Sequence, residues 1–396
     1  MTDTFRELFH SAEGMRVFRA PGRVNLIGEH TDYNLGFVLP VALDLATTVA
    51  TAPSSDGKLR IYSEHQRDMR EWDVGDIGRL ERTGHWSDYP IGVAQKLIHA
   101  GYPIEPANLL IRSSVPEGSG LSSSAALETS SALAFLRGRA IDPLTLAQLC
   151  QSAEVNFVGV PCGIMDQYVS IFGRENSAVE IDCRSLQHRY VDLPAGIAFV
   201  AVNSMVKHEL AASAYRERVK ECAAAVEIIG RRFPGVESLR DVTQEQLESL
   251  KSNLPGAIGR RARHVVTENA RLERFVEASA ATDVETMGRL FVESHRSLQN
   301  DYEVSCAELD FLVDSALAIE GVLGARMTGG GFGGCTVNLL RADAKAGFRE
   351  RISTTYEREF HVEPAFYPCK PSRGAAEEIQ NSLREHSTST DYIGKG

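Results

Sequence analysis

Residues 22–34 read Gly-Arg-Val-Asn-Leu-Ile-Gly-Glu-His-Thr-Asp-Tyr-Asn, and the rest of the chain is organised around this stretch. It concentrates a guanidinium, two carboxylates, an imidazole and two amides, and it shows neither helical nor alternating spacing. Glu29-His30-Thr31-Asp32 forms a compact polar block beside apolar residues that we expect to be buried. Such a block suits a small polyhydroxylated ligand, because each hydroxyl needs a donor or acceptor at short range. The alternative is a charged loop between two strands, and spacing alone favours neither.

Composition bounds the class of protein. The chain has 396 residues, 43% hydrophobic and 24% charged, as is typical of a soluble globular protein with room for two domains. Its net charge of −11 argues against nucleic acid as a partner, because phosphate backbones select for Lys and Arg. Seven scattered cysteines without a CxxC pair favour reduced thiols in the cytoplasm. The N-terminus lacks a signal-peptide pattern, and no apolar run approaches the roughly 20 residues that span a bilayer.

Strand and helix patterns mix in both halves, which predicts an α+β fold with a boundary near 190–200. The second half is helix-rich, and the amphipathic pattern over 256–300 predicts scaffold helices. Residues 377–396 are predicted to be a polar tail. We predict helices over 3–12, 86–100, from just after 120 to about 136, 143–158, 207–230, 243–252, 256–280, 284–300, 307–318 and 342–355.

Two hairpins are predicted among the strands. Residues 53–57, Pro-Ser-Ser-Asp-Gly, form a turn, so 58–63 is expected to pair back with 35–52. A glycine-rich turn between 324–328 and 335–340 predicts the second hairpin. The further strands are predicted over 15–20, 109–113, 178–183, 197–203 and 361–368.

Residues 116–125, Pro-Glu-Gly-Ser-Gly-Leu-Ser-Ser-Ser-Ala, lie between a predicted strand and a predicted helix. The first turn of a helix offers unpaired N–H groups and the positive end of its dipole. Gly118 and Gly120 allow a close backbone approach, so the turn is a plausible phosphate cradle. The alternative is a serine-capped helix after an ordinary glycine turn. The P-loop consensus GxxxxGK[ST] occurs nowhere in the chain.

A second glycine cluster covers 328–334, Thr-Gly-Gly-Gly-Phe-Gly-Gly, and formally matches GxGxxG. A dinucleotide fingerprint needs a helix directly after it. The next residues, Cys335-Thr-Val-Asn-Leu-Leu, are β-prone instead, which argues against that interpretation. The cluster more plainly predicts a tight turn that comes close to a ligand or another loop.

Single polar residues in apolar surroundings are further candidates. Asp166 stands alone within 161–168, Pro-Cys-Gly-Ile-Met-Asp-Gln-Tyr, where it is either a helix cap or a buried, paired carboxylate. Tyr215 shares a helical stripe with Val219 and Cys222, so composition favours a core aromatic. These residue types alone leave both alternatives open.

The three motifs together carry a resemblance that runs from about residue 16 to about residue 375. Residues 22–34 resemble, without interruption, the signature of the galactokinase family, and Thr31 and Asn34 are more similar to it than to the N-acetylgalactosamine kinases. Residues 116–125 resemble the PxxxGLxSSA motif, and 328–334 the third motif, of the GHMP small-molecule kinases. The resemblance implies a two-lobed GHMP kinase fold with the active site in the cleft, with an N-terminal lobe over 1–195 and a C-terminal lobe over 196–396.

By that resemblance the chain is expected to transfer the γ-phosphate of ATP to the anomeric hydroxyl of D-galactose. The products are α-D-galactose 1-phosphate and ADP, in the first phosphorylation step of galactose catabolism. Asp166 matches the family's catalytic Asp, and Arg23 the arginine that pairs with it. The expected sugar-binding residues are Glu29, His30, Thr31, Asp32, Gly163 and Tyr215.

The resemblance also implies an ATP- and Mg²⁺-binding set. Glu154, near the apolar edge of its helix, matches a metal-contacting position, although a surface Glu is the commoner outcome. The partners expected are galactose and ATP, with no nucleic acid and no membrane, for a monomer or weak homodimer. ATP is expected at Ser63, Gly118, Ser119, Gly120, Leu121, Ser122, Ser123 and Ser124, with Mg²⁺ at Ser124 and Glu154.

Two rival functions are considered. One is a GHMP kinase for N-acetylgalactosamine, arabinose or mevalonate, which a substrate panel would separate. The other is a kinase-like sugar sensor that binds ATP and galactose and regulates transcription. Sensors of that kind carry insertions or deletions in the glycine-serine motif, and residues 116–125 are intact.

Overall fold

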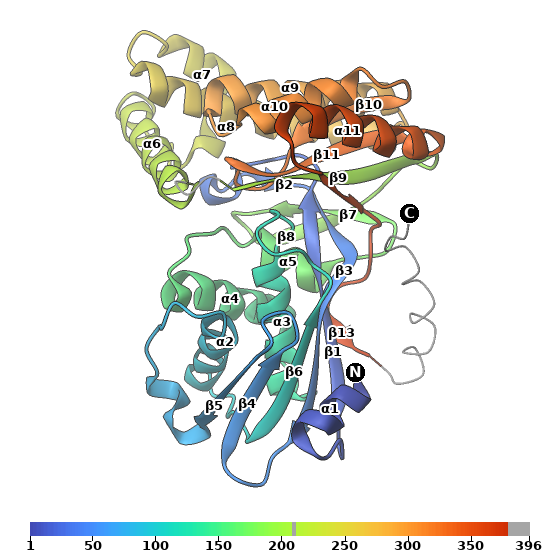
Figure 1. Cartoon of the computed structure of the whole chain (residues 1–396). Coiled ribbons are helices and arrows are strands. Elements are labelled where there is room, and N and C mark those ends of the chain that lie inside the picture. Colours follow the sequence, from blue (N-terminus) through green and yellow to red (C-terminus); the bar gives the residue numbers. More distant parts are fainter. Residues whose placement is uncertain (208–210, 379–396) are drawn as a thin grey trace.

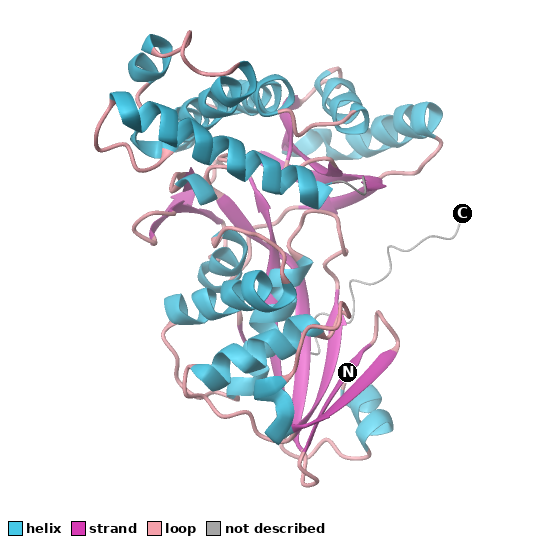
Figure 2. Ribbon diagram, turned by 90° about the vertical axis from the view of Figure 1, so that its left-hand side faces the viewer, coloured by secondary structure: helices cyan, strands magenta, loops and turns pink. Residues whose placement is uncertain are grey.

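The computed structural model describes residues 1–207 and 211–378, and it confirms the predicted α+β fold. The lower part in Figure 1 is built on a six-stranded sheet in the order β13-β1-β3-β6-β4-β5. Helices α2–α5 cover one face of this sheet, as the side view in Figure 2 shows. Its strands are β1 (Arg16–Asn25), β3 (Pro40–Pro53), β4 (Lys58–Ser63), β5 (Asp68–Asp73), β6 (Ala107–Ser113) and β13 (Ala376–Glu377).

The helices of this part follow the predicted periodicities closely. The second long predicted helix, 143–158, continues past α4 as a single π-turn (Glu154–Val158), and Glu154 at its start is buried. A short helix, α5, was not predicted and carries Asp166 in its first turn. The helices are α1 (Thr2–Phe9), α2 (Asp88–His99), α3 (Ser123–Leu136), α4 (Pro143–Ala153) and α5 (Met165–Phe172).

The predicted pairing of 58–63 with 35–52 is wrong. β4 pairs in parallel with β6 and antiparallel with β5, while β6 separates it from β3. The physical reason is the composition of β6, whose Leu109, Leu110 and Ile111 are all buried. A strand with a continuous apolar run is stabilised most in the interior of a sheet, so β6 takes the place between β3 and β4.

The upper part has a four-stranded sheet, β10-β11-β9-β12, under a layer of helices. The predicted hairpin of 324–328 with 335–340 is confirmed, since Arg326 of β10 lies opposite Val337 of β11. The strands are β9 (Ile197–Lys207), β10 (Val322–Met327), β11 (Gly333–Arg341) and β12 (Ala365–Pro368); the helices are α6 (Ala211–Arg232), α7 (Gln244–Ser249), α8 (Gly256–Ala280), α9 (Val284–Ser297), α10 (Ala307–Leu317) and α11 (Lys345–Phe360).

Three further strands, β2 (Phe37–Val38), β7 (Ser177–Asp182) and β8 (Gln187–Asp192), form a small sheet between the two parts. Two predictions fall partly outside the described residues, namely the start of the helix over 207–230 and the polar tail from 379 on. Among the described helices, none combines the length and the apolar character that crossing a bilayer requires.

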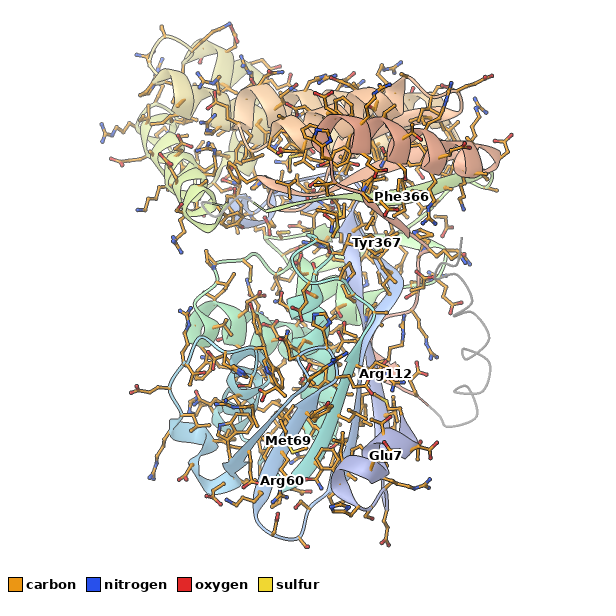
Figure 3. The ribbon with its side chains drawn as sticks, viewed as in Figure 1. Glu7, Arg60, Met69, Arg112, Phe366 and Tyr367 are labelled. Carbon is orange, nitrogen blue, oxygen red and sulfur yellow. The ribbon has the colours of Figure 1, made fainter. Side chains whose placement is uncertain are left out.

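The two parts share one hydrophobic core. Leu26 and Leu39 from the first part pack in the same buried cluster as Phe275 and Val337 from the second. Tyr367 of β12 packs against this shared cluster, while the preceding Phe366 packs into the cluster beneath α10 and α11 (Figure 3). The C-terminal segment then returns to the first part, where β13 pairs with β1. The predicted division into lobes at 195/196 stays a prediction. The C-terminal strand β13 belongs to the sheet of the first part, although it lies after this division in the sequence.

Candidate functional site

A pocket of about 200 Å³ lies at the junction of the two parts. Its walls come from β1, the loop after β1, the π-turn after α4, the start of α5, the first turns of α6 and the glycine cluster after β10. Among the predicted site residues, the pocket is lined by Arg23, Glu29, His30, Asp32, Glu154, Gly163, Asp166 and Tyr215. Residues from five separate regions of the sequence therefore converge on one cavity.

Arg23 and Asp166 form a two-pronged ion pair in this pocket. The Nε and Nη2 atoms of Arg23 each donate to a carboxylate oxygen of Asp166 at 2.8 Å. Nη1 of the same guanidinium donates to the backbone carbonyl of Gly120, and the hydroxyl of Ser122 donates to Asp166. Asp166 also lies in the first turn of α5, so its carboxylate faces three side-chain donors and the positive end of the helix dipole. Asp166 is therefore a paired carboxylate, and the helix-cap alternative is wrong, because Ile164 is the N-cap of α5 and no side chain caps this helix.

The glycine-serine turn lies next to this pair and opens a second pocket of about 280 Å³. Ser63, Gly118, Ser123 and Ser124 line it, together with other side chains. Trp86 and Tyr89 are aromatic walls that the sequence analysis did not single out. Two aromatic rings beside a helix N-terminus suit a planar base joined to phosphates.

The other members of the predicted ATP set build the turn itself. Ser119 and Leu121 are fully buried, and the Ser119 hydroxyl donates to the carbonyl of Pro116 at 2.8 Å. Ser122 takes a left-handed conformation, φ 61°, which is costly for a residue with a side chain. In this conformation its hydroxyl donates to Asp166 of the first pocket, while the next two residues, Ser123 and Ser124, line the second pocket.

The polar block lines the first pocket with three of its four residues. The Glu29 carboxylate is buried and accepts from Arg326 at 3.2 Å, from the Asn25 amide and from the backbone N–H of Gly329. Thr31 is also buried, but its hydroxyl donates to the Gly28 and Phe37 carbonyls, at 2.8 and 2.6 Å. Thr31 therefore holds the loop and lies outside the pocket wall.

Burial sets the charge state of His30. Nδ1 of His30 lies 2.8 Å from the hydroxyl of Tyr33, while Nε2 is buried without a hydrogen-bond partner among the described residues. Burial lowers the pKa of His30 to about 3, so the imidazole is neutral and keeps a free polar atom at the pocket. The ring centroids of Tyr215 and His30 lie 5.7 Å apart, and both residues line the pocket.

Asp32 and Gly163 face each other so closely that the glycine is required. A Cβ atom added to Gly163 would lie 1.7 Å from Oδ2 of Asp32. Burial raises the pKa of Asp32 to about 6, and the nearby carboxylates of Asp166 and Glu29 add to the rise. A hydroxyl donor placed on this carboxylate would stabilise its ionised form.

Glu154 lines the first pocket and is buried. Its carboxylate accepts from Gln167 at 2.6 Å, from the Cys162 thiol and from the hydroxyl of Ser124. Burial, followed by the charge of Asp166, raises its pKa. Within residues 1–207 and 211–378 no group of three or more His, Cys, Asp or Glu side chains could hold a metal. The buried Glu154–Ser124 pair has the oxygen chemistry of a site that Mg²⁺ completes with phosphate and water.

The second glycine cluster supports the glycine-serine turn from the other part of the molecule. A Cβ atom at Gly334 would lie 3.1 Å from the carbonyl oxygen of Ser119, and one at Gly331 would lie 2.2 Å from that of Val304. Gly331 also has φ +81°, so its conformation and its surroundings both require glycine. The predicted tight turn at 328–334 therefore contacts another loop.

Comparisons with known proteins agree with this geometry. Three family models match the chain: "Galactokinase galactose-binding signature" over residues 3–53, "GHMP kinases N terminal domain" over 88–174 and "GHMP kinases C terminal" over 275–358. A galactokinase of Roseiflexus sp. is 44% identical over 96% of this chain and 98% of its own. The galactokinase of Homo sapiens is 44% identical over 89% and 90%.

Solved structures give the same result for the fold. The structure of Lactococcus lactis galactokinase complexed with galactose matches with a TM-score of 0.90 and 36% identity, over 95% of this chain and 98% of that one. A mevalonate kinase structure matches at 16% identity with a TM-score of 0.67, over 90% and 99%, which shows the shared fold alone.

Proposed function

This chain belongs to the galactokinase family of the GHMP kinases, and on that premise we propose how its residues carry out the reaction. As a galactokinase it transfers the γ-phosphate of ATP to the anomeric hydroxyl of D-galactose, giving α-D-galactose 1-phosphate and ADP. The observation that carries the assignment of roles is the Arg23–Asp166 pair, because it lines the smaller pocket and is hydrogen-bonded to Gly120 and Ser122 of the glycine-serine turn, whose next residues line the other pocket. The smaller pocket takes the sugar and the pocket beside Trp86 takes the nucleotide.

Asp166 accepts the proton of the anomeric hydroxyl. The freed oxygen forms a bond to the γ-phosphorus while the bond between that phosphorus and the leaving oxygen of ADP breaks. Such transfers pass through a loose transition state, so catalysis depends mainly on positioning and on charge stabilisation. Arg23 holds the Asp166 carboxylate in place through two hydrogen bonds, and its guanidinium stabilises the charge that spreads on the transferred group.

Mg²⁺ is assigned to Ser124 and Glu154. When bound, the ion neutralises charge on the phosphates of ATP. The support for this assignment is a buried carboxylate whose pKa is raised, beside a serine hydroxyl and facing Asp166. A cation there removes the cost of keeping two carboxylates close together.

The sugar hydroxyls are assigned to Glu29, His30 and Asp32, with Gly163 admitting the carboxylate of Asp32 and Tyr215 packing on the sugar. The neutral imidazole of His30 offers one free nitrogen, and Asp32 offers an acceptor. A 4-hydroxyl of the wrong configuration would leave one of these buried groups unpaired, which is how polar sites discriminate strongly.

The test is an ADP-release assay across galactose, N-acetylgalactosamine, arabinose, mevalonate and glucose, with and without Mg²⁺. Galactose should give the highest kcat/KM, and turnover should require the cation. Activity with another substrate and none with galactose would overturn the substrate, and turnover with EDTA present would overturn the metal assignment. The monomeric or weakly dimeric state and the cytoplasmic location stay predictions.

A further inference from the structure

Helix α8, which the sequence predicts as scaffold, holds the start of the loop that carries the polar block. The buried carboxylate of Glu268 accepts from the backbone N–H of Gly28 at 3.0 Å. His264, one turn earlier and also fully buried, donates from Nε2 to the carbonyl of Glu29 at 3.0 Å. The backbone on both sides of the Gly28–Glu29 peptide is therefore bound to one helix from the other half of the sequence.

The same helix holds the end of this loop. Oδ1 of Asn269 accepts from the backbone N–H of Phe37 at 3.0 Å. Gly36 packs directly beneath it, since a Cβ atom there would lie 2.5 Å from the same oxygen. Figure 1 shows β2, which begins at Phe37, lying with the upper part of the molecule beneath these helices.

The loop between these anchors has a conformation that needs support. Gly28 has φ +91°, and His30 has φ +61° although it carries a side chain. Residues in the left-handed region persist only where their surroundings fix them. The direction of the His30 imidazole and of the Glu29 carboxylate thus depends on the anchors at Gly28 and Glu29.

The chemistry of Glu268 suits an anchor. Its carboxylate also accepts from the Ser294 hydroxyl and from Nε of Arg271, both at 2.7 Å, so every partner is a donor. Burial alone would raise its pKa, but Arg271 and the other donors bring it to about 2. A neutral amide at this position could keep one oxygen on Gly28 and Ser294, but it would turn its N–H₂ group toward the donor Nε of Arg271, so Gln cannot reproduce all the contacts that hold the anchor in place.

We propose that Glu268, His264 and Asn269 form a clamp on α8 that positions the polar block for the sugar, and that this clamp sets affinity and epimer selectivity without contacting the substrate. The proposal rests on the assignment of the smaller pocket to galactose. It makes these three side chains positioning residues, contributed by one half of the chain to a site whose sugar-binding side chains come mainly from the other.

The experiment measures galactose binding and nucleotide binding separately, by calorimetry on the full-length protein. Glu268→Gln should raise the Kd for galactose about tenfold, equivalent to about 1.4 kcal/mol, and lower the preference for galactose over glucose. The Kd for a non-hydrolysable ATP analogue should stay within about twofold. Asn269→Ala, which removes only the second anchor, should raise the galactose Kd about threefold.

The matched control is Glu273→Gln, which removes an exposed carboxylate from the same helix and should change neither constant. Parallel weakening of sugar and nucleotide binding would mean a general structural role and overturn the clamp, as would an unchanged galactose Kd. If Glu268→Gln fails to fold, Asn269→Ala is the test: a raised Kd for galactose with an unchanged Kd for the ATP analogue supports the clamp, and any other result overturns it. A measurement on the native protein distinguishes a wrong substrate assignment from a wrong clamp. If the native protein does not bind galactose, the substrate assignment fails, whereas native binding with an unchanged galactose Kd in the variants means that the clamp fails.

Discussion

Replacing Gly163 with alanine tests the sugar pocket with a single methyl group. A Cβ atom at this position lies 1.7 Å from Oδ2 and 2.4 Å from Cγ of Asp32, whereas ordinary contact begins near 3.4 Å. The backbone of Gly163 lies outside the left-handed region, so alanine can adopt it without strain. The whole effect therefore falls on the Asp32 side chain, which must withdraw by about half of the ordinary contact distance.

The size of the effect follows from that displacement. A misplacement of about 1 Å in a reacting complex can cost about 100-fold in rate. We therefore expect Gly163→Ala to lower kcat/KM for galactose about 100-fold. The KM for ATP should change less than about twofold, because neither residue lines the nucleotide pocket. Overpacking of this kind should also lower the free energy of unfolding by about 1–3 kcal/mol.

The assay is the initial rate of ADP release with galactose varied at saturating ATP. Gly347→Ala is the control, since a Cβ atom there meets no described atom within 4 Å. A double-mutant cycle, read as galactose Kd, then isolates the clash. In an Asp32→Ala background Gly163→Ala should cost much less than in the native protein, because only the contact with Cβ of residue 32, at 3.0 Å, remains. Unchanged kcat/KM in the single variant, or additive effects in the cycle, would refute the reasoning.

Three other predictions concern charged groups. Arg23→Lys should lower kcat about 100-fold with little change in the KM for galactose, because lysine cannot hold both oxygens of Asp166; a pure KM effect in steady-state kinetics would contradict this. Arg326→Met should lower the free energy of unfolding by about 3–5 kcal/mol in urea titrations, since it strands the buried carboxylate of Glu29, and adding Glu29→Gln should restore part of the loss. The pKa of Asp32 rises from 3.8 in the unfolded chain to about 6 in the folded protein, so its contribution to stability is lost as pH rises through 6. Asp32→Asn should therefore have a higher Tm than the native protein at pH 8 but not at pH 4. Below pH 6, kcat/KM for galactose should fall in the native protein and not in the variant.

Local sequence patterns predicted the helices well and the strand partners poorly. The helix over 256–280 was predicted with the bounds that α8 has, because its apolar stripe is continuous and proline precedes it. The pairing of 58–63 was wrong because the choice of a sheet neighbour depends on burial of β6, which lies more than forty residues further on. β5 was missed because its sequence, Asp-Met-Arg-Glu-Trp-Asp, is mostly exposed and lacks alternation.

The residues of the candidate site were likewise predicted only in part. Motif residues such as Arg23 and Asp166 were found because whole segments resembled a family, and the structure brings them together. Arg326 and Glu268 were missed because a charged residue in a strand or helix is usually exposed. Both are fully buried, and their partners are backbone groups about 240 to 300 positions away. No local pattern encodes such partners, so only the folded chain identifies them.

The position of the site at the junction constrains how substrates enter. The two parts share a continuous apolar core, and Arg326 binds the carbonyl oxygens of Asn25 and Leu26 across the junction. Separating the parts would expose that core and leave the buried guanidinium of Arg326 and the carboxylate of Glu29 unpaired, which is costly. Galactose and ATP must therefore enter through the mouths of their own pockets. The proposed catalytic pair is held by contacts within the protein, because Asp166 accepts from Arg23 and from Ser122 of the glycine-serine turn; on the proposed mechanism, binding then has to place the hydroxyl and the phosphate against it.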